Sequence, residues 1–186
     1  WIGQFGFEAA QKLAESNNET PKLSYRFTAK TTESVKASLQ RESIDNEQSF
    51  LRELADNGKI YFQDEASQLV AKAVNLQVGE KFLDVCAAPA SKLTQIATDC
   101  TQTVYGGDLH FRRLELMKNS AQKQGLNNIQ ILQYNAEDSL PFADETFDVV
   151  LVDAPCSGTG TIRHNPEIRY NLGEQDLPDL SAKQLK

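Results

Sequence analysis

The sequence contains little cysteine, and the spacing of the few cysteines argues against a structural metal. Cys86, Cys100 and Cys156 are an odd number of thiols in a chain that opens without a signal-peptide pattern. Their spacing matches no zinc-binding motif, so we expect no metal site. Unpaired thiols are typical of a reducing compartment, which predicts a cytoplasmic protein.

Long apolar runs and positive charge are also lacking. No apolar run approaches the about 20 residues that a membrane span requires, so we expect no membrane segment. The formal net charge of −7 excludes a protein that binds nucleic acid by overall attraction. Contact with RNA would need a local basic patch instead. The first residue is Trp1 rather than Met, which suggests a piece of a longer protein.

Neither of the common phosphate-binding glycine motifs is present. The segment Cys86-Ala87-Ala88-Pro89-Ala90-Ser91-Lys92 joins an expected strand to an expected helix and contains no glycine. A pyrophosphate ligand is therefore disfavoured. Small side chains still let a ligand approach the backbone, and the helix N-terminus offers unpaired N–H groups. Taken alone, the segment could also be an ordinary strand-to-helix loop.

The hydrophobic pattern predicts an α/β fold from residue 58 onward. Apolar runs typical of strands lie at residues 82–86, 104–108, 129–133 and 147–152, and helical patterns at 64–74, 91–98 and 112–124. Strands that alternate with helices indicate βαβ units and a doubly wound parallel sheet. In the helix after Asp64, the pattern places an inner face on Ala66, Leu69, Val70, Ala73 and Val74. Residues 1–57 have shorter patterns and predict a small α+β appendage.

Polar residues follow each predicted strand, and in parallel sheets ligands bind at that edge. Asp108 follows the second strand, where an acid can bind a ribose diol. Asn135 follows the third strand and could either bind an adenine edge or form an Asx-turn. A nucleoside without a pyrophosphate fits these features, and S-adenosylmethionine is such a molecule.

The segment Asp153-Ala154-Pro155-Cys156 follows the last predicted strand and suggests covalent chemistry. A thiolate that adds to C6 of a pyrimidine turns C5 into a nucleophile able to accept a methyl group. A neighbouring acid can hydrogen-bond the ring nitrogen that gains electron density. The alternative is a structural cysteine beside a proline turn, because free cysteine is often a buried small hydrophobe.

Four segments together resemble the Sun/nucleolar family of RNA cytosine-C5 methyltransferases, and the bacterial 16S rRNA branch in particular. They are Phe62-Gln63-Asp64-Glu65-Ala66-Ser67, Leu83-Asp84-Val85-Cys86-Ala87-Ala88-Pro89, Asp153-Ala154-Pro155-Cys156-Ser157-Gly158-Thr159-Gly160 and Asn165-Pro166-Glu167-Ile168-Arg169. The resemblance covers residues 59–186 closely and residues 1–30 more loosely.

The resemblance implies a Rossmann-like S-adenosylmethionine-dependent methyltransferase fold with an incomplete parallel sheet. Residues 1–57 would be the remnant of an N-terminal RNA-binding region, and residues 58–186 a methyltransferase core that stops before its last strands. The implied reaction is methylation of cytosine C5 in RNA, with ribosomal RNA as the expected partner. The implied cofactor-binding residues are Cys86, Ala87, Ala88, Pro89, Ala90, Ser91, Lys92, Asp108, Arg113, Asn135 and Asp153.

The resemblance also divides the catalytic work between two cysteines. One of them is Cys156, close to the other expected catalytic residue, Asp153. Cys156 would help to release the product, and the attacking thiol would belong to a later Thr-Cys motif beyond Lys186, so this fragment alone would be inactive. The sequence departs from the family at Ala90-Ser91-Lys92-Leu93, where Gly-Gly-Lys-Thr is usual, and at Asn135, where aspartate is usual.

Three alternatives stay open at this point. The chain could be a non-catalytic module that binds S-adenosylmethionine or RNA, because the second cysteine motif is missing from it. Cys156 could itself be the attacking thiol. Finally, Arg163, His164 and Arg169 could position RNA phosphates, or they could form a solvated loop balanced by Glu167 and Glu174.

Overall fold

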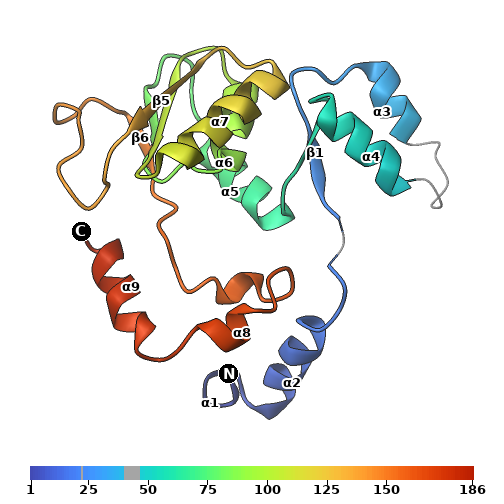
Figure 1. The fold of residues 1–186 in the computed structure, drawn as a ribbon, viewed down its shortest axis with the longest axis vertical. Helices are drawn as coiled ribbons and strands as arrows, with labels where there is room; N and C mark the ends of the chain where they lie inside the picture. Colours follow the sequence, from blue (N-terminus) through green and yellow to red (C-terminus); the bar gives the residue numbers. More distant parts are fainter. Residues whose placement is uncertain (22, 40–46) are drawn as a thin grey trace. The chain divides into compact units, whose positions relative to one another are not determined.

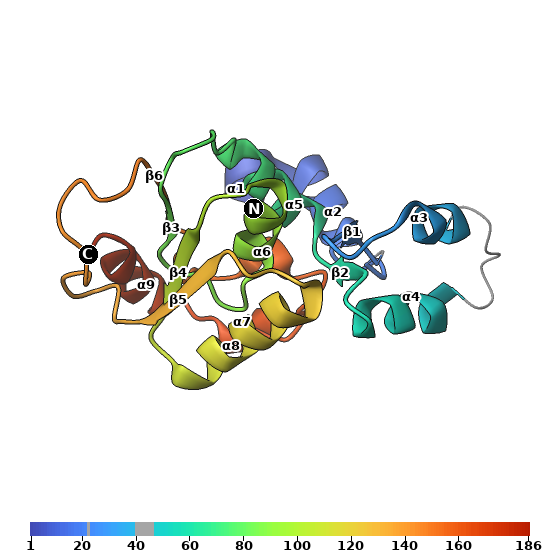
Figure 2. The same ribbon diagram turned by 90° about the horizontal axis from the view of Figure 1, so that it is seen from above.

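The computed structural model describes residues 1–21, 23–39 and 47–186, which form two compact units (Figures 1 and 2). One unit is residues 24–154 and contains the sheet, and the other combines residues 1–23 with residues 155–186. Each unit is described by itself. The division that the sequence predicts between residues 57 and 58 stays a prediction.

The larger unit contains the expected parallel sheet. Its strands are β3 (Phe82–Asp84), β4 (Val104–Asp108), β5 (Ile129–Gln133) and β6 (Val149–Leu151), in the order β5-β4-β3-β6. All three strand pairs are parallel. Helix α6 (Ser91–Asp99) connects β3 to β4, and α7 (Phe111–Gln124) connects β4 to β5. The α/β fold class and the incomplete parallel sheet are therefore confirmed.

Two strands are shorter than the sequence predicts. β3 ends at Asp84 rather than Cys86, and β6 covers Val149–Leu151 rather than residues 147–152. The chain beyond β3 still bonds to both neighbours. The Val85 N–H donates to the Leu151 carbonyl at 2.9 Å, and the Ala87 N–H donates to the Gly107 carbonyl at 2.9 Å.

Each face of the sheet has its own core, as the alternation of side chains along a strand requires. Phe82 packs on the helix-covered face with Leu93, Val104 and Met117, which are fully buried. Leu83, the next residue, packs on the other face with Tyr134. Burial of one such large apolar side chain stabilises the fold by about 1.5–3 kcal/mol. The strands are thereby fixed, and their carboxyl ends meet at one edge.

Helix α5 (Glu65–Val74) begins where expected but turns a different face inward. Its N-cap is Asp64, whose side chain accepts the Ala66 N–H at 2.8 Å. Most of the expected inner face is wrong, because Leu69 is 65% exposed and Val70 is 41% exposed. Val74 of that face does pack against the core, together with Ala71, which the pattern did not include.

The polar side of α5 causes this difference. Its Gln68 side chain donates to the Gln63 carbonyl at 2.9 Å, and its backbone carbonyl accepts from Gln95 of α6 at 3.1 Å. Gln68 is therefore half-buried on the side of α5 that faces α6. A reading based on apolar spacing alone assigns the neighbouring stripe to the core.

A two-stranded antiparallel ribbon, here called the β1–β2 ribbon, precedes the parallel sheet in the chain and belongs to the same compact unit. Strands β1 (Tyr25–Phe27) and β2 (Ile60–Phe62) pair antiparallel, and helices α3 (Glu33–Leu39) and α4 (Glu47–Asp56) lie between them in the sequence. In both views, β1 lies between the α3–α4 pair and helices α5–α7 (Figures 1 and 2). Gly58 makes the approach to α7 possible, because a Cβ there would lie 1.9 Å from the Lys123 carbonyl oxygen.

The smaller unit consists of short helices from both ends of the chain. They are α1 (Ile2–Phe5), α2 (Phe7–Ser16), the 3-10 helix η2 (Thr159–Thr161), α8 (Ile168–Asn171) and α9 (Asp176–Gln184). The N-terminal segment forms two helices that are divided at Gly6, which has a φ of 78°. Within the described part of the chain, none of the helices has the length and apolar character to cross a membrane.

Candidate active site

The carboxyl ends of the four strands bring the expected polar residues to one edge of the sheet. The clearest contact joins Lys92, from the loop after β3, to Asp153, which follows β6. The Lys92 Nζ lies 2.5 Å from the Asp153 Oδ2, although 61 residues separate the two in the chain. The Lys92 side chain is 16% exposed and that of Asp153 is 55% exposed. The contact therefore opens to solvent on the Asp153 side.

The loop of residues 86–92 is held in one backbone conformation. The Ala88–Pro89 peptide bond is cis, and the Ala90 N–H donates to the Ala87 carbonyl. Ala90 is buried with a φ of 78°, in the left-handed region where a Cβ costs about 1–2 kcal/mol. The glycine that is usual in the family would avoid this cost. The loop keeps the required turn with alanine in its place.

Two glycines of β4 let the loop and the next strand approach closely. A Cβ on Gly106 would lie 2.5 Å from the Leu93 Cδ2 and 2.9 Å from the Ala87 Cβ. A Cβ on Gly107 would lie 2.3 Å from the Tyr134 ring. The sequence reading did not assign these residues, although paired glycines at the end of a strand are the signal for such a close approach.

Asp84, the last residue of β3, is a site residue that the sequence reading missed. Its side chain is 2% exposed, and its Oδ1 has no hydrogen-bond partner within the described residues. Burial raises the pKa of the Asp84 carboxyl to about 7, and the nearby Lys92 ammonium opposes this rise. An acid inside an apolar strand was the available signal. A positively charged group beside Asp84 would lower that pKa again.

Asp108, at the end of β4, has the position that the sequence predicts and is already oriented. Its Oδ1 accepts the His110 N–H at 2.8 Å, and its Oδ2 lies 3.2 Å from the Arg113 Nη1. Arg113 is thus near the site through its ion pair with Asp108. The carboxylate is buried, and these two donors fix its direction.

Asn135 adopts the local turn that was one of its two expected roles. Its Oδ1 accepts the Glu137 N–H at 3.2 Å, and its Nδ2 donates to the Asp138 Oδ2 at 2.9 Å. This is an Asx-turn. A ligand that used the Asn135 side chain would have to share it with this turn.

The two cysteines near the strand ends have different environments. Burial and the acids Asp84, Asp108 and Asp153 raise the pKa of the Cys86 thiol, which keeps it protonated. Cys86 is therefore unsuited to attack as a thiolate. Cys156 is exposed and belongs to the other unit of the chain. Its catalytic role stays a prediction.

The arginines after Cys156 bind the protein's own N-terminal segment. Arg163 Nη2 donates to the Glu19 Oε2 at 3.2 Å, and Arg169 Nη2 donates to the Asn17 carbonyl at 2.8 Å. Both bonds lie within the smaller unit. The structure pairs these arginines with Glu19 and the Asn17 carbonyl rather than with Glu167 and Glu174. The Arg163 Nε is buried without a partner within the described residues, so a role toward RNA phosphates stays a prediction.

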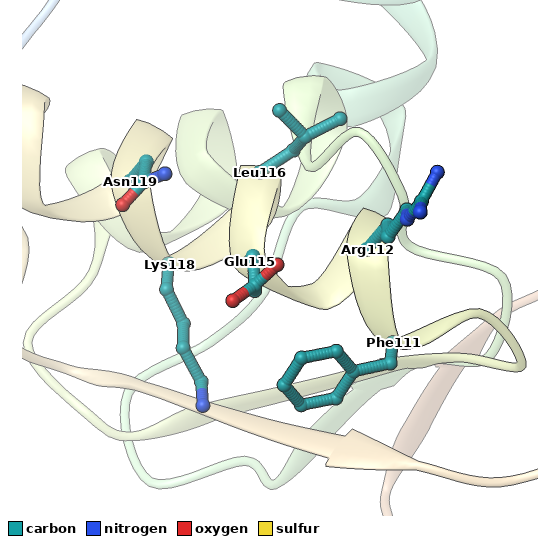
Figure 3. Close-up of a pocket in the computed structure, with 6 residues that line it drawn as sticks. All are labelled: Phe111, Arg112, Glu115, Leu116, Lys118 and Asn119. Carbon is teal, nitrogen blue, oxygen red and sulfur yellow. The ribbon is translucent and has the colours of Figure 1, made fainter.

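Within the described residues, neither a metal cluster nor the hollow on α7 provides a second candidate site. Within the described ranges, no group of three or more His, Cys, Asp or Glu side chains could hold a metal ion. A hollow on the outer surface of α7 has none of the expected site residues in its lining (Figure 3). Its lining residues are Phe111, Arg112, Glu115, Leu116, Lys118 and Asn119.

The sequence matches a family model described as 16S rRNA methyltransferase RsmB/F over residues 71–186. The chain belongs to this family. It is 33% identical to the probable ribosomal RNA small subunit methyltransferase B of Bacillus subtilis over 100% of this chain and 46% of that protein. It is 36% identical to the Thermus thermophilus ribosomal RNA small subunit methyltransferase B over 67% of this chain and 30% of that protein. The chain thus spans less than half the length of these relatives.

Solved structures support the fold of this family member. The crystal structure of PH0851 has a TM-score of 0.80 at 24% identity and covers 99% of this chain and 47% of that one. The crystal structure of NSun6 from Pyrococcus horikoshii with SFG has a TM-score of 0.63 at 24% identity, over 70% of this chain and 34% of that one. At this level of identity, the likeness concerns the fold.

Proposed function

We propose that the protein to which this chain belongs transfers a methyl group from S-adenosylmethionine to C5 of a cytosine in ribosomal RNA. The observation that carries the proposal is the convergence of Asp84, Lys92, Asp108 and Asp153 at one edge of a parallel sheet. Family membership and the names of the relatives support the substrate class. The reduced thiols suggest that the protein works in the cytoplasm.

The residues at this edge fit S-adenosylmethionine. The buried Asp84 oxygen without a partner suits a positively charged ligand, and both the amino group and the sulfonium of this molecule carry positive charge. Residues 86–92 offer backbone groups to its methionine part, and Asp108 offers a carboxylate to its ribose. Arg113 would act through Asp108, and Asn135 would lie near the adenine. When bound, S-adenosylmethionine supplies an electrophilic methyl group.

The chain's own residues would bind and orient the cytosine. In its protonated form, Asp153 would donate a hydrogen bond to the ring nitrogen that gains electron density when a thiolate adds to C6, while Lys92 orients the carboxyl group through its Oδ2. C5 would form its bond to the methyl group as the bond between that methyl group and the donor sulfur breaks, which releases S-adenosylhomocysteine. C5 would then give its proton to water, and the electron pair left behind would re-form the C5–C6 double bond as the C6–S bond breaks and the thiolate leaves. We propose that Cys156 assists this release and that the attacking thiol lies in a part of the protein outside this chain.

A methyl-transfer assay on the full-length protein tests this function. The protein should transfer labelled methyl groups from S-adenosylmethionine to cytosine in 16S rRNA, and Asp153→Ala should lower the rate by about 10²-fold or more. Transfer only to proteins or small molecules would contradict the proposal.

Trapping experiments decide the role of Cys156. If Cys156 releases the product, Cys156→Ala should accumulate a covalent complex between protein and RNA that survives denaturing electrophoresis. Complete loss of this complex would instead identify Cys156 as the attacking thiol.

A second candidate function is a module that binds S-adenosylmethionine without turnover. The turn that engages Asn135 and the alanine at position 90 favour it, because both depart from the family pattern at the cofactor edge. Methyl transfer by the full-length protein would exclude this candidate. Binding without transfer would support it.

A further inference from the structure

A buried arginine of the β1–β2 ribbon contacts α6, the helix that follows the candidate cofactor-binding loop. Arg26 of β1 is 8% exposed, and its guanidinium reaches α6 and α7. Nε donates to the Gln63 Oε1 at 2.7 Å, while Nη2 donates to the Thr94 Oγ1 at 2.7 Å and to the Gln124 Oε1 at 3.0 Å. One planar group thus joins three separate segments of the chain.

The bonds of Arg26 continue directly into the loop of residues 86–92. Nη2 also lies 3.4 Å from the Ser91 carbonyl oxygen. The Thr94 hydroxyl accepts from Arg26 and donates to the Ala90 carbonyl at 2.7 Å. Ala90 is the residue with the left-handed backbone at the start of α6. Arg26 is therefore connected to this turn through one side chain.

The second partner of Arg26 strengthens the same connection. Gln63 accepts from Arg26 and donates to the Gln95 Oε1 of α6 at 2.9 Å. Gln95 in turn donates to the Gln68 carbonyl of α5 at 3.1 Å. The β1–β2 ribbon and the residue that follows it are thus bonded to two consecutive residues of α6, Thr94 and Gln95. This arrangement fixes the rotation of the helix as well as its position.

The partners of Arg26 are unusual for a buried cation. Within the described part of the chain, its hydrogen-bond acceptors are amide, hydroxyl and backbone oxygens, and none is a carboxylate. If Arg26 served packing alone, an apolar side chain in its place could hold the elements together without the cost of burying a charge. The guanidinium adds direction, because its donors lie in a fixed plane. That property suits a residue that sets the geometry of a loop.

We propose that Arg26 is a positioning residue for the cofactor site, which it orients through Thr94 and the turn at Ala90. The β1–β2 ribbon is then a functional part of the site, although it lies before the residues that match the methyltransferase family model. The inference rests on the proposed function, because it requires that residues 86–92 bind S-adenosylmethionine.

The most specific test compares two substitutions of Thr94 in the full-length protein. Thr94→Ser keeps the hydroxyl that accepts from Arg26 and donates to Ala90, whereas Thr94→Val keeps the shape and removes the hydroxyl. Calorimetric titration with S-adenosylmethionine, well below the unfolding temperature, should show about tenfold weaker binding for Thr94→Val. Thr94→Ser should bind within about twofold of the unchanged protein.

A second pair of variants tests Arg26 itself. Arg26→Met should weaken binding by about tenfold or more, and Arg26→Lys should recover only part of the loss, because an ammonium cannot reproduce the planar fork. Arg52→Met, on the exposed surface of α4, is the matched control and should leave the affinity unchanged. If Arg26→Met fails to fold, the Thr94 pair still decides the matter.

The outcomes separate this inference from the proposed function. If the unchanged full-length protein does not bind S-adenosylmethionine, the proposed function fails. If it binds, and Thr94→Val binds equally well, the positioning role of Arg26 is wrong while the function stands. Lower thermal stability with unchanged affinity would likewise overturn the inference, because it would assign the network to folding alone.

Discussion

Two buried charged side chains near the same loop have opposite surroundings. Arg26 lies under the start of α6, and the chain supplies a partner to each of its three guanidinium nitrogens. Asp84 lies at the end of β3, and one of its oxygens has no partner within the described residues. Burial favours the neutral form of each group. It lowers the pKa of Arg26 to about 10 and raises the pKa of Asp84 to about 7.

The difference teaches which polar group the chain already satisfies and which awaits a ligand. A buried polar group without a partner costs about 1–3 kcal/mol, so native structures rarely contain one without a reason. The Arg26 network is complete and can stabilise the protein by itself. Asp84 is incomplete, and a cationic ligand would complete it. The predictions below test this distinction.

The largest effect is expected from Arg26→Met. The substitution leaves Gln63, Thr94 and Gln124 with unpaired buried groups, which should lower the free energy of unfolding by about 3–5 kcal/mol. Chemical denaturation measures this change. A loss below about 1 kcal/mol would show that the network contributes little and would remove half of the comparison.

Asp84→Asn should have the opposite effect on stability. The folded pKa of about 7 lies above the ordinary value of 3.8, so the folded protein binds the proton more tightly than the unfolded chain does. Stability should therefore fall as pH rises from about 4 to about 7, because ionisation in the fold is penalised.

The asparagine removes this dependence, so the variant should exceed the original protein by at most about 4 kcal/mol near pH 8 and match it near pH 4. Denaturation across this pH range provides the measurement. A variant that is less stable near pH 8 would show that the Asp84 carboxylate is already satisfied by the chain.

Gly107→Ala should disturb the Asp84 side of the site while leaving Arg26 alone. The new Cβ would lie 2.3 Å from the Tyr134 ring, so the cost should be about 1–3 kcal/mol. Gly160→Ala is the matched control, because no described atom lies within 4 Å of its Cβ position. Equal stability of the two variants would show that the ring moves freely, and thus that the Asp84 side is loosely packed.

The smallest effect is expected from Asp64→Ala, because Asp64 is an exposed N-cap residue. Its loss gives the cost of removing an exposed polar contact, with which the costs at buried Arg26 and Asp84 can be compared. Loss of its bond to the Ala66 N–H should cost about 1 kcal/mol, and Asp64→Asn should keep most of the stability. Thermal unfolding of both variants measures this. A loss as large as that of Arg26→Met would mean that burial does not distinguish the two kinds of polar contact.

Periodicity and strand ends made much of the fold and the site predictable from the sequence. The four strands, the helix that ends at Gly125 and the polar residues at Asp108 and Asp153 follow from local patterns. Such patterns depend on residues close in the chain. Family resemblance added the expected roles of the loop residues and of Cys156.

The rest depends on contacts between distant residues. Most of the inward face of α5 was predicted wrongly, because the side that contacts α6 includes Gln68, which apolar spacing does not assign to the core. Arg26 has the pattern of an ordinary polar residue in an alternating strand, and the side chains that accept its hydrogen bonds lie 37 to 98 residues away. The free oxygen of Asp84 is visible only when the packing around it is known.

Titration of the full-length protein with S-adenosylmethionine at about pH 5.5 and about pH 7.5 tests the central claim most directly. If Asp84 binds the cationic part of this molecule, the unchanged protein should bind more tightly at the higher pH, where the carboxyl ionises. Asp84→Asn should bind more weakly, with little dependence on pH. Equal affinity of the two proteins at both pH values would contradict the account.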